Sequence, residues 1–256
     1  MEHLPGLVGL FLAGVIGGAI NSVAGGGTLV SFPALIAFGV PTIVANATNT
    51  AAVCPGSLSS AFAYRNDMPS GGGLLWTLML PSLAGGLAGA VILAITPESL
   101  FARIVPFLIL FATLIFGTRD LFARFINLGH PSGEHVSLPG RIWGFSFQFL
   151  VAAYGGYFGA GIGILMLASL SLMGLRDIHR MNAIKTVLAT VINGTALVYF
   201  ILRRLVFWPL AILMASGCIV GGYLGAHYAK GVDQKRLRLF IVTIGLLVSL
   251  WLFIRR

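Results

Sequence analysis

Long apolar stretches alternate with short polar connections along the whole chain. The first half has apolar segments at 5–23, 28–40, 43–64, 72–95 and 99–118, and the second half has them at 143–160, 162–175, 181–202, 206–229 and 237–254. At about 1.5 Å rise per residue, roughly 20 helical residues cross a hydrocarbon layer of ~30 Å. The segments lack the every-second-residue alternation of a membrane β-barrel. The pattern therefore predicts an all-α polytopic membrane protein.

The second half of the sequence repeats the first. GGLAGA at 85–90 matches GGYLGA at 221–226, and NATNT at 46–50 matches NAIKT at 182–186, both at an offset of 136 residues. The glycines at 17–18 and 25–27 resemble those at 155–156 and 159–163 once a gap of two residues is allowed. Two blocks in one register indicate a duplication. We predict a first transmembrane repeat over 1–120, a polar connecting loop over 121–141 and a second repeat over 142–256.

The second segment of each half is short and follows its predecessor after only a few residues rich in glycine. Such a pair is typical of broken or re-entrant helices rather than of two full spans. Whether the pair crosses twice or enters and returns, each half makes an odd number of crossings. The two repeats, of four to five helical segments each, are therefore predicted to have inverted topology.

The basic residues support an assignment of sides. The chain has 16 Lys and Arg against seven Asp and Glu, a formal net charge of +9, but the positive residues form short clusters between apolar segments instead of one patch for nucleic acid. Cytoplasmic connections are enriched in Lys and Arg. The predicted cytoplasmic set is Arg65, Arg119, Arg124, Arg141, Arg176, Arg180, Lys230, Lys235, Arg236 and Arg238, and the opposite set is Arg103, Arg203, Arg204, Arg255 and Arg256. Both termini are then periplasmic.

The glycine-rich breaks are candidate anion sites. A broken helix leaves free backbone N–H groups and a positive dipole end inside the protein, and both attract anions. Three consecutive glycines break a helix, whereas the glycines of 85–90 and 221–226 suit close packing of helices. The predicted binding residues at the breaks are Asn21, Ser22, Gly25, Gly26, Gly27, Thr28, Gly159, Gly161 and Gly163.

Charged residues inside the predicted spans indicate which kind of substrate to expect. All seven acidic residues fall at a terminus or in a predicted connection, whereas Lys185 lies inside the apolar stretch 181–190. An unpaired charge at the centre of a membrane helix costs about 2.5–3.5 kcal/mol on insertion scales. If Lys185 is interior, a bound anion is expected to neutralise it. The alternative is that Lys185 extends to the cytoplasmic headgroups.

Polar residues at repeat-matched positions complete the predicted site. The segment at 46–50 offers amide and hydroxyl donors, and the segment at 182–186 offers the same with a lysine. Such donors suit the oxygens of a sulfonate, sulfite or carboxylate. Each one taken alone is also typical of interhelical hydrogen bonding. The residues are Asn46, Asn49, Thr50, Asn182, Lys185 and Thr186.

Other function classes fit less well. Sodium and proton transporters normally use Asp or Glu within the membrane, which the predicted spans lack. No His-Glu-x-x-His motif, paired carboxylates or phosphate loop is present in the sequence, so neither an enzyme nor a bound cofactor or metal is expected.

The motifs resemble those of the sulfite exporter TauE/SafE family of bacterial and plant membrane permeases. The matching stretches are 17–27 (GGAINSVAGGG), Phe32-Pro33, 46–50 (NATNT), 155–163 (GGYFGAGIG) and 182–186 (NAIKT). The resemblance implies transport of sulfite, sulfonates or other organic anions through a body of seven to nine helices in a bacterial inner membrane. It also implies that Asn21, the glycines 25–27, Asn46, Asn49, Gly159, Gly161, Asn182 and Lys185 are site or gate elements.

The expected function is therefore a permease for a small anion. Alternating access at a site between the repeats is the expected mechanism. A passive anion channel and a non-transporting membrane interaction protein remain as alternatives, and a homodimer is compatible with the sequence. The expected partners are the small anionic substrate and the lipid bilayer.

Overall fold

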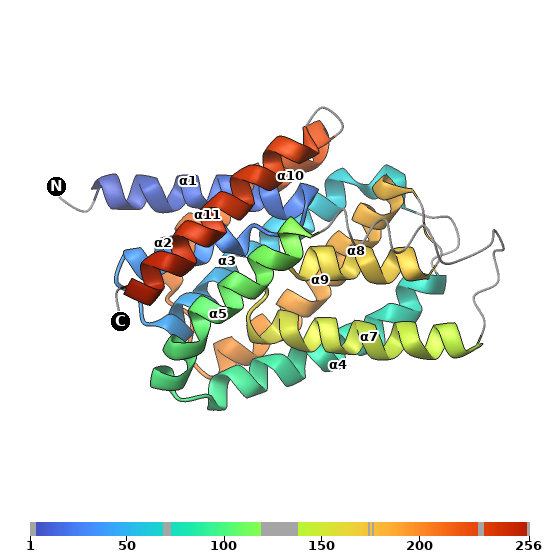
Figure 1. Cartoon of the computed structure of the whole chain (residues 1–256), viewed down its shortest axis with the longest axis horizontal. Coiled ribbons are helices and arrows are strands. Elements are labelled where there is room, and N and C mark those ends of the chain that lie inside the picture. Colours follow the sequence, from blue (N-terminus) through green and yellow to red (C-terminus); the bar gives the residue numbers. More distant parts are fainter. Residues whose placement is uncertain are drawn as a thin grey trace.

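The computed structural model describes residues 4–68, 73–118, 138–173, 175, 177–229 and 233–254. These residues form ten α-helices and one short 3-10 helix, with no strand among them (Figure 1). The first half contains α1 (Leu4–Val23), α2 (Thr28–Ala37), α3 (Thr42–Ala63), η1 (Arg65–Asp67), α4 (Gly73–Ile95) and α5 (Glu98–Gly117). The second half contains α7 (Leu138–Tyr157), α8 (Ile162–Leu172), α9 (Ile178–Leu202), α10 (Trp208–Tyr228) and α11 (Gln234–Ile254).

The predicted all-helical fold is confirmed, and each predicted apolar segment corresponds to one helix. The resemblance implied seven to nine helices, and the described residues form ten because each short helix after a break counts separately. α7 begins at Leu138 rather than at 143, so it includes the last residues of the predicted connecting loop. Most of that loop lies outside the described residues. So do Arg119, Arg124, Arg176, Lys230, Arg255, Arg256, Glu2, Asp120 and Glu134.

The helices differ in length and polarity, and these two properties decide which of them can cross a membrane. Six helices among the described residues are long and apolar enough to cross a membrane: α1, α4, α5, α9, α10 and α11. α3 has 22 residues, enough length to cross, but carries several Asn, Thr and Ser residues. α2 and α8 have 10 and 11 residues, which confirms that the second segment of each half is too short for a full span.

The two halves are interleaved rather than side by side. α1 packs along α10, and its counterpart α7 packs along α4, the counterpart of α10. In the same way α3 packs on α10 while α9 packs on α4, and the central pairs α3 with α9 and α5 with α11 join counterparts directly. Figure 1 shows α4 beside α7 at one edge and α1 at the opposite edge. Exchanging the halves therefore reproduces the pattern of helix contacts.

Glycines let the paired helices approach closely. A Cβ on Gly14 or Gly18 of α1 would come within 2.5 Å of the carbonyl oxygen of Met214 or Cys218 of α10. A Cβ on Gly85 of α4 would lie 2.5 Å from the carbonyl oxygen of Phe149 of α7. Residue numbers rise together along both pairs, so α1 runs parallel to α10. By the same register, with Gly89 against Ala153, α4 runs parallel to α7. The predicted packing role of the small-residue blocks is thus confirmed.

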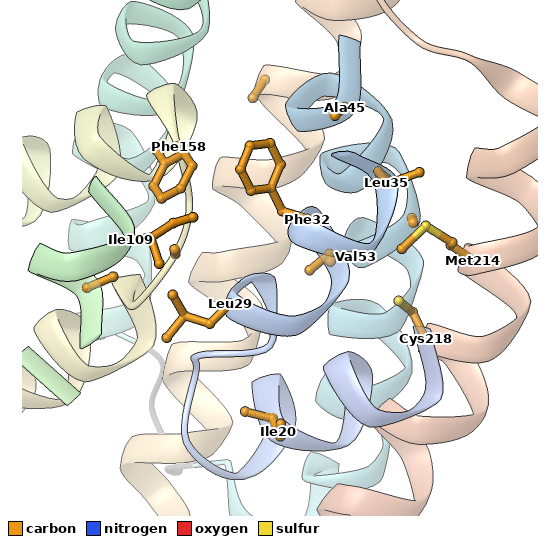
Figure 2. Packing of buried hydrophobic residues seen from close by; sticks show 14 of the residues in the cluster. Ile20, Leu29, Phe32, Leu35, Ala45, Val53, Ile109, Phe158, Met214 and Cys218 are labelled. Carbon is orange, nitrogen blue, oxygen red and sulfur yellow. The ribbon is translucent and has the colours of Figure 1, made fainter. Parts of the chain in front are cut away.

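The apolar core joins the halves around the two helix breaks. Its fully buried side chains include Phe32 of α2, Ile109 of α5 and Phe158, which follows α7. Figure 2 shows the rings of Phe32 and Phe158 turned toward each other, with Leu29 and Ile109 beside them, and their centroids are 5.3 Å apart in an edge-to-face arrangement. Edge-to-face pairs are a favoured aromatic geometry. The core thereby fixes α2 against the second break.

Candidate functional site

The first break lies between α1 and α2. α1 ends at Val23, and the N–H groups of Ala24 and Gly25 donate to the carbonyl of Ile20 at 2.8 and 3.1 Å. Gly25 has a φ of +80°, in the left-handed region that favours glycine, and this conformation ends the helix. The chain then turns through Gly26 and Gly27 into α2. The glycine run predicted to break the helix does so.

The second break has the same position relative to its helices. α7 ends at Tyr157 and α8 begins at Ile162. Gly159 and Gly161 have φ values of +79° and +78°, so both adopt the left-handed conformation. Residues 158–161 occupy the place that residues 24–27 occupy in the first half.

The two breaks touch each other. A Cβ on Gly25 would fall well inside van der Waals contact with Gly163 Cα, in the first turn of α8, and a Cβ on Gly163 would meet Gly25 Cα in the same way. The direct backbone neighbour of Gly25 is thus Gly163, while Gly161 lies against Ala112 of α5. The beginning of α8 therefore lies against the turn that leads into α2.

The N-terminal ends of both short helices lack a side-chain cap. Gly27 is the N-cap of α2 and Gly161 is the N-cap of α8, and neither supplies a side-chain hydrogen bond. The first backbone N–H groups of a helix have no partner within the helix, and they carry its positive dipole end. The N–H of Leu29 donates to the carbonyl of Gly26 at 3.0 Å, and that of Ile164 donates to the carbonyl of Gly161 at 3.1 Å, so these two groups have partners. The two positive dipole ends at one crossing, inside the protein, still favour an anion.

Asn49 of α3 ties the beginning of α2 in place. Its Oδ1 accepts from Ser31 Oγ at 2.6 Å, and its Nδ2 donates to Thr28 Oγ1 at 3.4 Å. All three side chains are buried. Two of the predicted residues, Thr28 and Asn49, are therefore adjacent, and Ser31 joins them without having been singled out from the sequence.

Lys185 is buried, with 1% of its surface exposed. Its Nζ donates to the carbonyl oxygens of Ser22 at 2.9 Å and Asn21 at 3.3 Å. These carbonyls belong to the last turn of α1, where the helix dipole is negative, so a cation is stabilised there. The side chain therefore turns inward to the first break instead of extending to the headgroups. The sequence suggested a bound anion as the partner of Lys185, and the carbonyls at the end of α1 already compensate part of its charge.

Asn46 of α3, in the first half, contacts the end of α7 in the second half, just as Lys185 of α9 contacts the end of α1. Its Nδ2 donates to the carbonyl oxygen of Tyr157, the last residue of α7, at 3.0 Å. The end of the first helix in each half is thus held by a polar side chain from the third helix of the other half, α9 or α3. This bond fixes the amide of Asn46, so Oδ1 faces away from Tyr157 and makes no hydrogen bond with the described residues. Oδ1 of Asn182, the repeat-related residue, is also buried without such a partner.

The remaining predicted residues contact their own helix or a neighbouring one. The hydroxyls of Thr50 and Thr186 donate to carbonyls of their own helices, of Asn46 at 3.0 Å and Ala183 at 2.9 Å. Asn21 donates from Nδ2 to Ser57 Oγ at 3.2 Å. Gly26 lies against the ring of Phe116, and Gly27 against the backbone of Gly17.

The acidic residues that the structure describes lie at helix ends. Glu98 accepts from the N–H and the hydroxyl of Thr42 at 2.5 and 2.6 Å, at the beginning of α3. Asp177 caps α9 by accepting from the N–H groups of His179 and Arg180, and these bonds lower the pKa of its carboxyl below the ordinary value. Within the described residues no Asp or Glu is buried, and no three His, Cys, Asp or Glu side chains gather as a metal site would require.

Long apolar helices, polar groups buried between them and helix breaks at the centre of the fold define a multi-pass membrane protein of the transporter class. The sequence profile of the family described as Sulfite exporter TauE/SafE matches residues 10–252. The chain belongs to this family, as its motifs suggested.

Curated relatives cover nearly the whole chain. A protein of Sinorhizobium sp described as "Probable membrane transporter protein ORF9" is 29% identical over 94% of this chain and 90% of its own length. A "Probable membrane transporter protein" of Haemophilus influenzae is 26% identical over 94% and 91%, and "Probable membrane transporter protein YfcA" of Escherichia coli K12 is 28% identical over 96% and 89%. No solved structure matches. Family and relatives together indicate a membrane transporter.

Proposed function

We propose that the protein carries a small anion, such as sulfite, a sulfonate or another organic anion, across the bacterial inner membrane by alternating access. The cargo binds where the beginnings of α2 and α8 meet, at the crossing of Gly25 and Gly163. The observation that carries the proposal is the pair of uncapped helix N-termini at that crossing, together with the absence of a buried carboxylate among the described residues.

The charge of the surroundings supports an anion. Lys185 is the buried charged residue of the described part of the chain, and it holds the end of α1 next to the first break. The carbonyl oxygens that it contacts carry only partial charges, about half an elementary charge for a whole helix end. The region therefore keeps a positive potential, which favours an anion over a cation.

The proposal includes two halves of opposite orientation. Its support is the parallel packing of α1 with α10 and of α4 with α7. α3 also runs parallel to α10, since Thr48 contacts Phe207 and Ser60 contacts Gly222. If the short connection between α3 and α4 reverses direction, α4 and α7 oppose α1 and α10. Figure 1 is consistent with this arrangement, because α1 begins and α11 ends at the same end of the molecule.

Binding to purified protein tests the proposal. Thermal stabilisation by sulfite, thiosulfate, sulfoacetate, taurine and formate is measured for the wild type, Lys185→Met and Arg103→Met. Both variants lose one positive charge, but Arg103 is exposed on α5, far along the sequence from either break. We expect Lys185→Met to lose anion stabilisation and Arg103→Met to keep it. Equal affinity in Lys185→Met and wild type would remove Lys185 from the proposed site.

Counterflow separates a carrier from a channel. Vesicles containing the protein are loaded with unlabelled anion and then given labelled anion outside. A carrier accumulates labelled anion transiently inside the vesicles, because each return of its binding site to the outer face carries unlabelled anion out. A channel gives no such transient accumulation. Absence of any binding or flux across the anion panel would favour the non-transporting alternative.

A further inference from the structure

Three side-chain amide oxygens are buried in the described part of the chain without a hydrogen bond to the described residues. They are Oδ1 of Asn46, Oδ1 of Asn182 and Oε1 of Gln148. An amide oxygen can only accept a hydrogen bond, whereas the hydroxyl of a serine or tyrosine can turn and either donate or accept. A buried acceptor that no donor reaches destabilises a protein, so each of these oxygens calls for an explanation.

Asn46 holds its amide at the second break. Its side chain is 1% exposed, and its Nδ2 donates to the carbonyl oxygen of Tyr157, the last residue of α7, at 3.0 Å. A carbonyl oxygen accepts only from the nitrogen of an amide, so this bond also fixes which atom of the side chain is Oδ1. The second break, residues 158–161, follows Tyr157 directly. The amide with the unpartnered oxygen is therefore bound to the helix end from which the second break starts.

Asn182 has the matching position in the second half. The duplication pairs it with Asn46, and its side chain is 5% exposed. It lies one turn before Lys185 on α9, so the two side chains share a face of the helix with about 5–6 Å between their Cβ atoms. Lys185 in turn reaches the carbonyl of Ser22, at the end of α1 that leads into the first break. Two repeat-related acceptors therefore accompany the two breaks.

These acceptors restrict the kind of anion that suits the site. Lys185 and the two helix N-termini attract a negative group, and a fully ionised sulfonate or carboxylate offers only acceptor atoms. Such a group cannot donate a hydrogen bond to an amide oxygen, and the partial negative charge of that oxygen repels it. A substrate that suits both kinds of protein group has a negative end and, apart from it, a hydrogen-bond donor.

The charge of Lys185 decides which donor fits. An ammonium group on the substrate would be repelled by the Lys185 ammonium. An acid O–H close to a positive charge tends to lose its proton, because an opposite charge favours the ionised form. An alcohol hydroxyl is neutral and keeps its proton, so it can donate to an amide oxygen beside a lysine.

We propose that the substrate is a small organic anion that carries an alcohol hydroxyl, and that Oδ1 of Asn46 and Oδ1 of Asn182 accept hydrogen bonds from this hydroxyl. The hydroxyl has one proton, so it donates to one of the two oxygens at a time. The negative end of the substrate lies toward the helix N-termini and Lys185. The proposal names the substrate class of the proposed anion site and rests on the proposed anion transport.

Three anions with one skeleton provide the test. Isethionate, propane-1-sulfonate and taurine each carry a sulfonate on a two-carbon chain, and the chain ends in a hydroxyl, a methyl group and an ammonium, respectively. Their dissociation constants for the purified protein are measured by isothermal titration calorimetry. We expect isethionate to bind about tenfold or more tightly than propane-1-sulfonate, because the methyl group leaves a buried acceptor without a donor. Taurine should bind more weakly than isethionate because Lys185 repels its ammonium.

Leucine variants identify the oxygens that accept the hydrogen bond. Leucine has nearly the shape of asparagine but no acceptor, so a protein with both Asn46→Leu and Asn182→Leu should bind isethionate and propane-1-sulfonate with equal affinity. The ratio of the two dissociation constants is the informative quantity, because a general loss of anion binding affects both anions alike. The two single variants show which oxygen takes the bond, and a wild-type ratio in both would overturn the proposal even if the double variant fails to fold.

Gln148→Met is the matched control. It removes the third unpartnered amide oxygen, on a side chain that is fully buried and whose Nε2 donates to Ser82 Oγ at 2.9 Å. At ~1.5 Å per residue, Gln148 lies about 13 Å before the end of α7, away from both breaks. Gln148→Met should therefore keep the wild-type ratio. A loss of the ratio as large as that of the double variant would overturn the assignment of Asn46 and Asn182.

The wild-type protein alone already tests the substrate class. Equal affinities for isethionate and propane-1-sulfonate would mean that water satisfies the two oxygens and would overturn the proposal, while the proposed anion transport would stand. Tighter binding of taurine than of isethionate would overturn the choice of a hydroxyl as the donor. If no anion binds, neither these three nor sulfite, thiosulfate, sulfoacetate and formate, the proposed function fails as well.

Discussion

Replacing Gly25 by alanine tests whether the two helix breaks must touch. A residue with a side chain at its φ of +80° costs about 1–2 kcal/mol in backbone strain. The new Cβ would also overlap Gly163 Cα, whereas carbon atoms normally pack at ~3.5–4.0 Å, so the backbones would have to separate by roughly 1 Å. Overpacking of this kind costs about 1–3 kcal/mol. The expected loss for Gly25→Ala is therefore about 2–5 kcal/mol.

Two other glycine substitutions separate the cost of backbone strain from the cost of steric overlap. Gly39 has a φ of +89° and nothing within 4 Å of an added Cβ, so Gly39→Ala carries the strain alone. Gly163 lies in the first turn of α8 and has no positive φ, so Gly163→Ala carries the overlap alone. Thermal unfolding in detergent should rank the wild type above both single-cause variants, and Gly25→Ala below both.

Transport measured in vesicles completes this comparison. We expect Gly39→Ala to transport normally and both Gly25→Ala and Gly163→Ala to be impaired, because both displace the helix N-termini from the site. A Gly163→Ala protein that unfolds at the wild-type temperature and transports normally would refute the contact between the breaks. A Gly39→Ala protein as unstable as Gly25→Ala would show that strain alone accounts for the loss.

Two other predictions concern helix capping and orientation. The pKa of Asp177 is lowered in the folded state, so its capping stabilises the protein above the ordinary carboxyl pKa of about 3.9 and is lost as the pH falls through the folded-state value. Asp177→Ala should unfold at a lower temperature than wild type near neutral pH, with the difference shrinking in acid; a constant difference would contradict this origin. In a background with both native cysteines replaced by alanine, Asn66→Cys should react with an impermeant reagent only from the cytoplasmic side and Arg203→Cys only from outside. Labelling of both from one side would contradict the inverted halves.

Local signals in the sequence predicted the helices well. The glycine runs mark both breaks because a residue with positive φ ends a helix whatever surrounds it. Two helices begin earlier than predicted, because the prediction gave hydropathy more weight than the local signals for a helix start. α9 begins at Ile178 rather than 181 because Asp177 caps it, and α7 begins at Leu138, where Pro139 is tolerated in a first turn.

The site was only partly predictable, because its contacts join distant parts of the chain. The apolar context of Lys185 indicated its importance, but its partners lie 163 and 164 positions earlier, on carbonyls that any residue type would supply. The duplication was the one sequence feature that related distant residues, and it paired Asn46 with Asn182, whose Oδ1 atoms are both buried without a hydrogen bond to the described residues.

The interleaving of the halves also sets a condition on how the protein is made. α1 is synthesised first, yet the helix along which its glycines pack is α10, and α4 likewise depends on α7. If the first half enters the membrane before the second half is made, its glycine faces lie against lipid until the second half arrives. Premature pairing with another nascent chain is the hazard of such an order. We therefore expect assembly to be completed only after α10 has been synthesised, so that a ribosome stalled before α10 would leave an open, protease-sensitive first half.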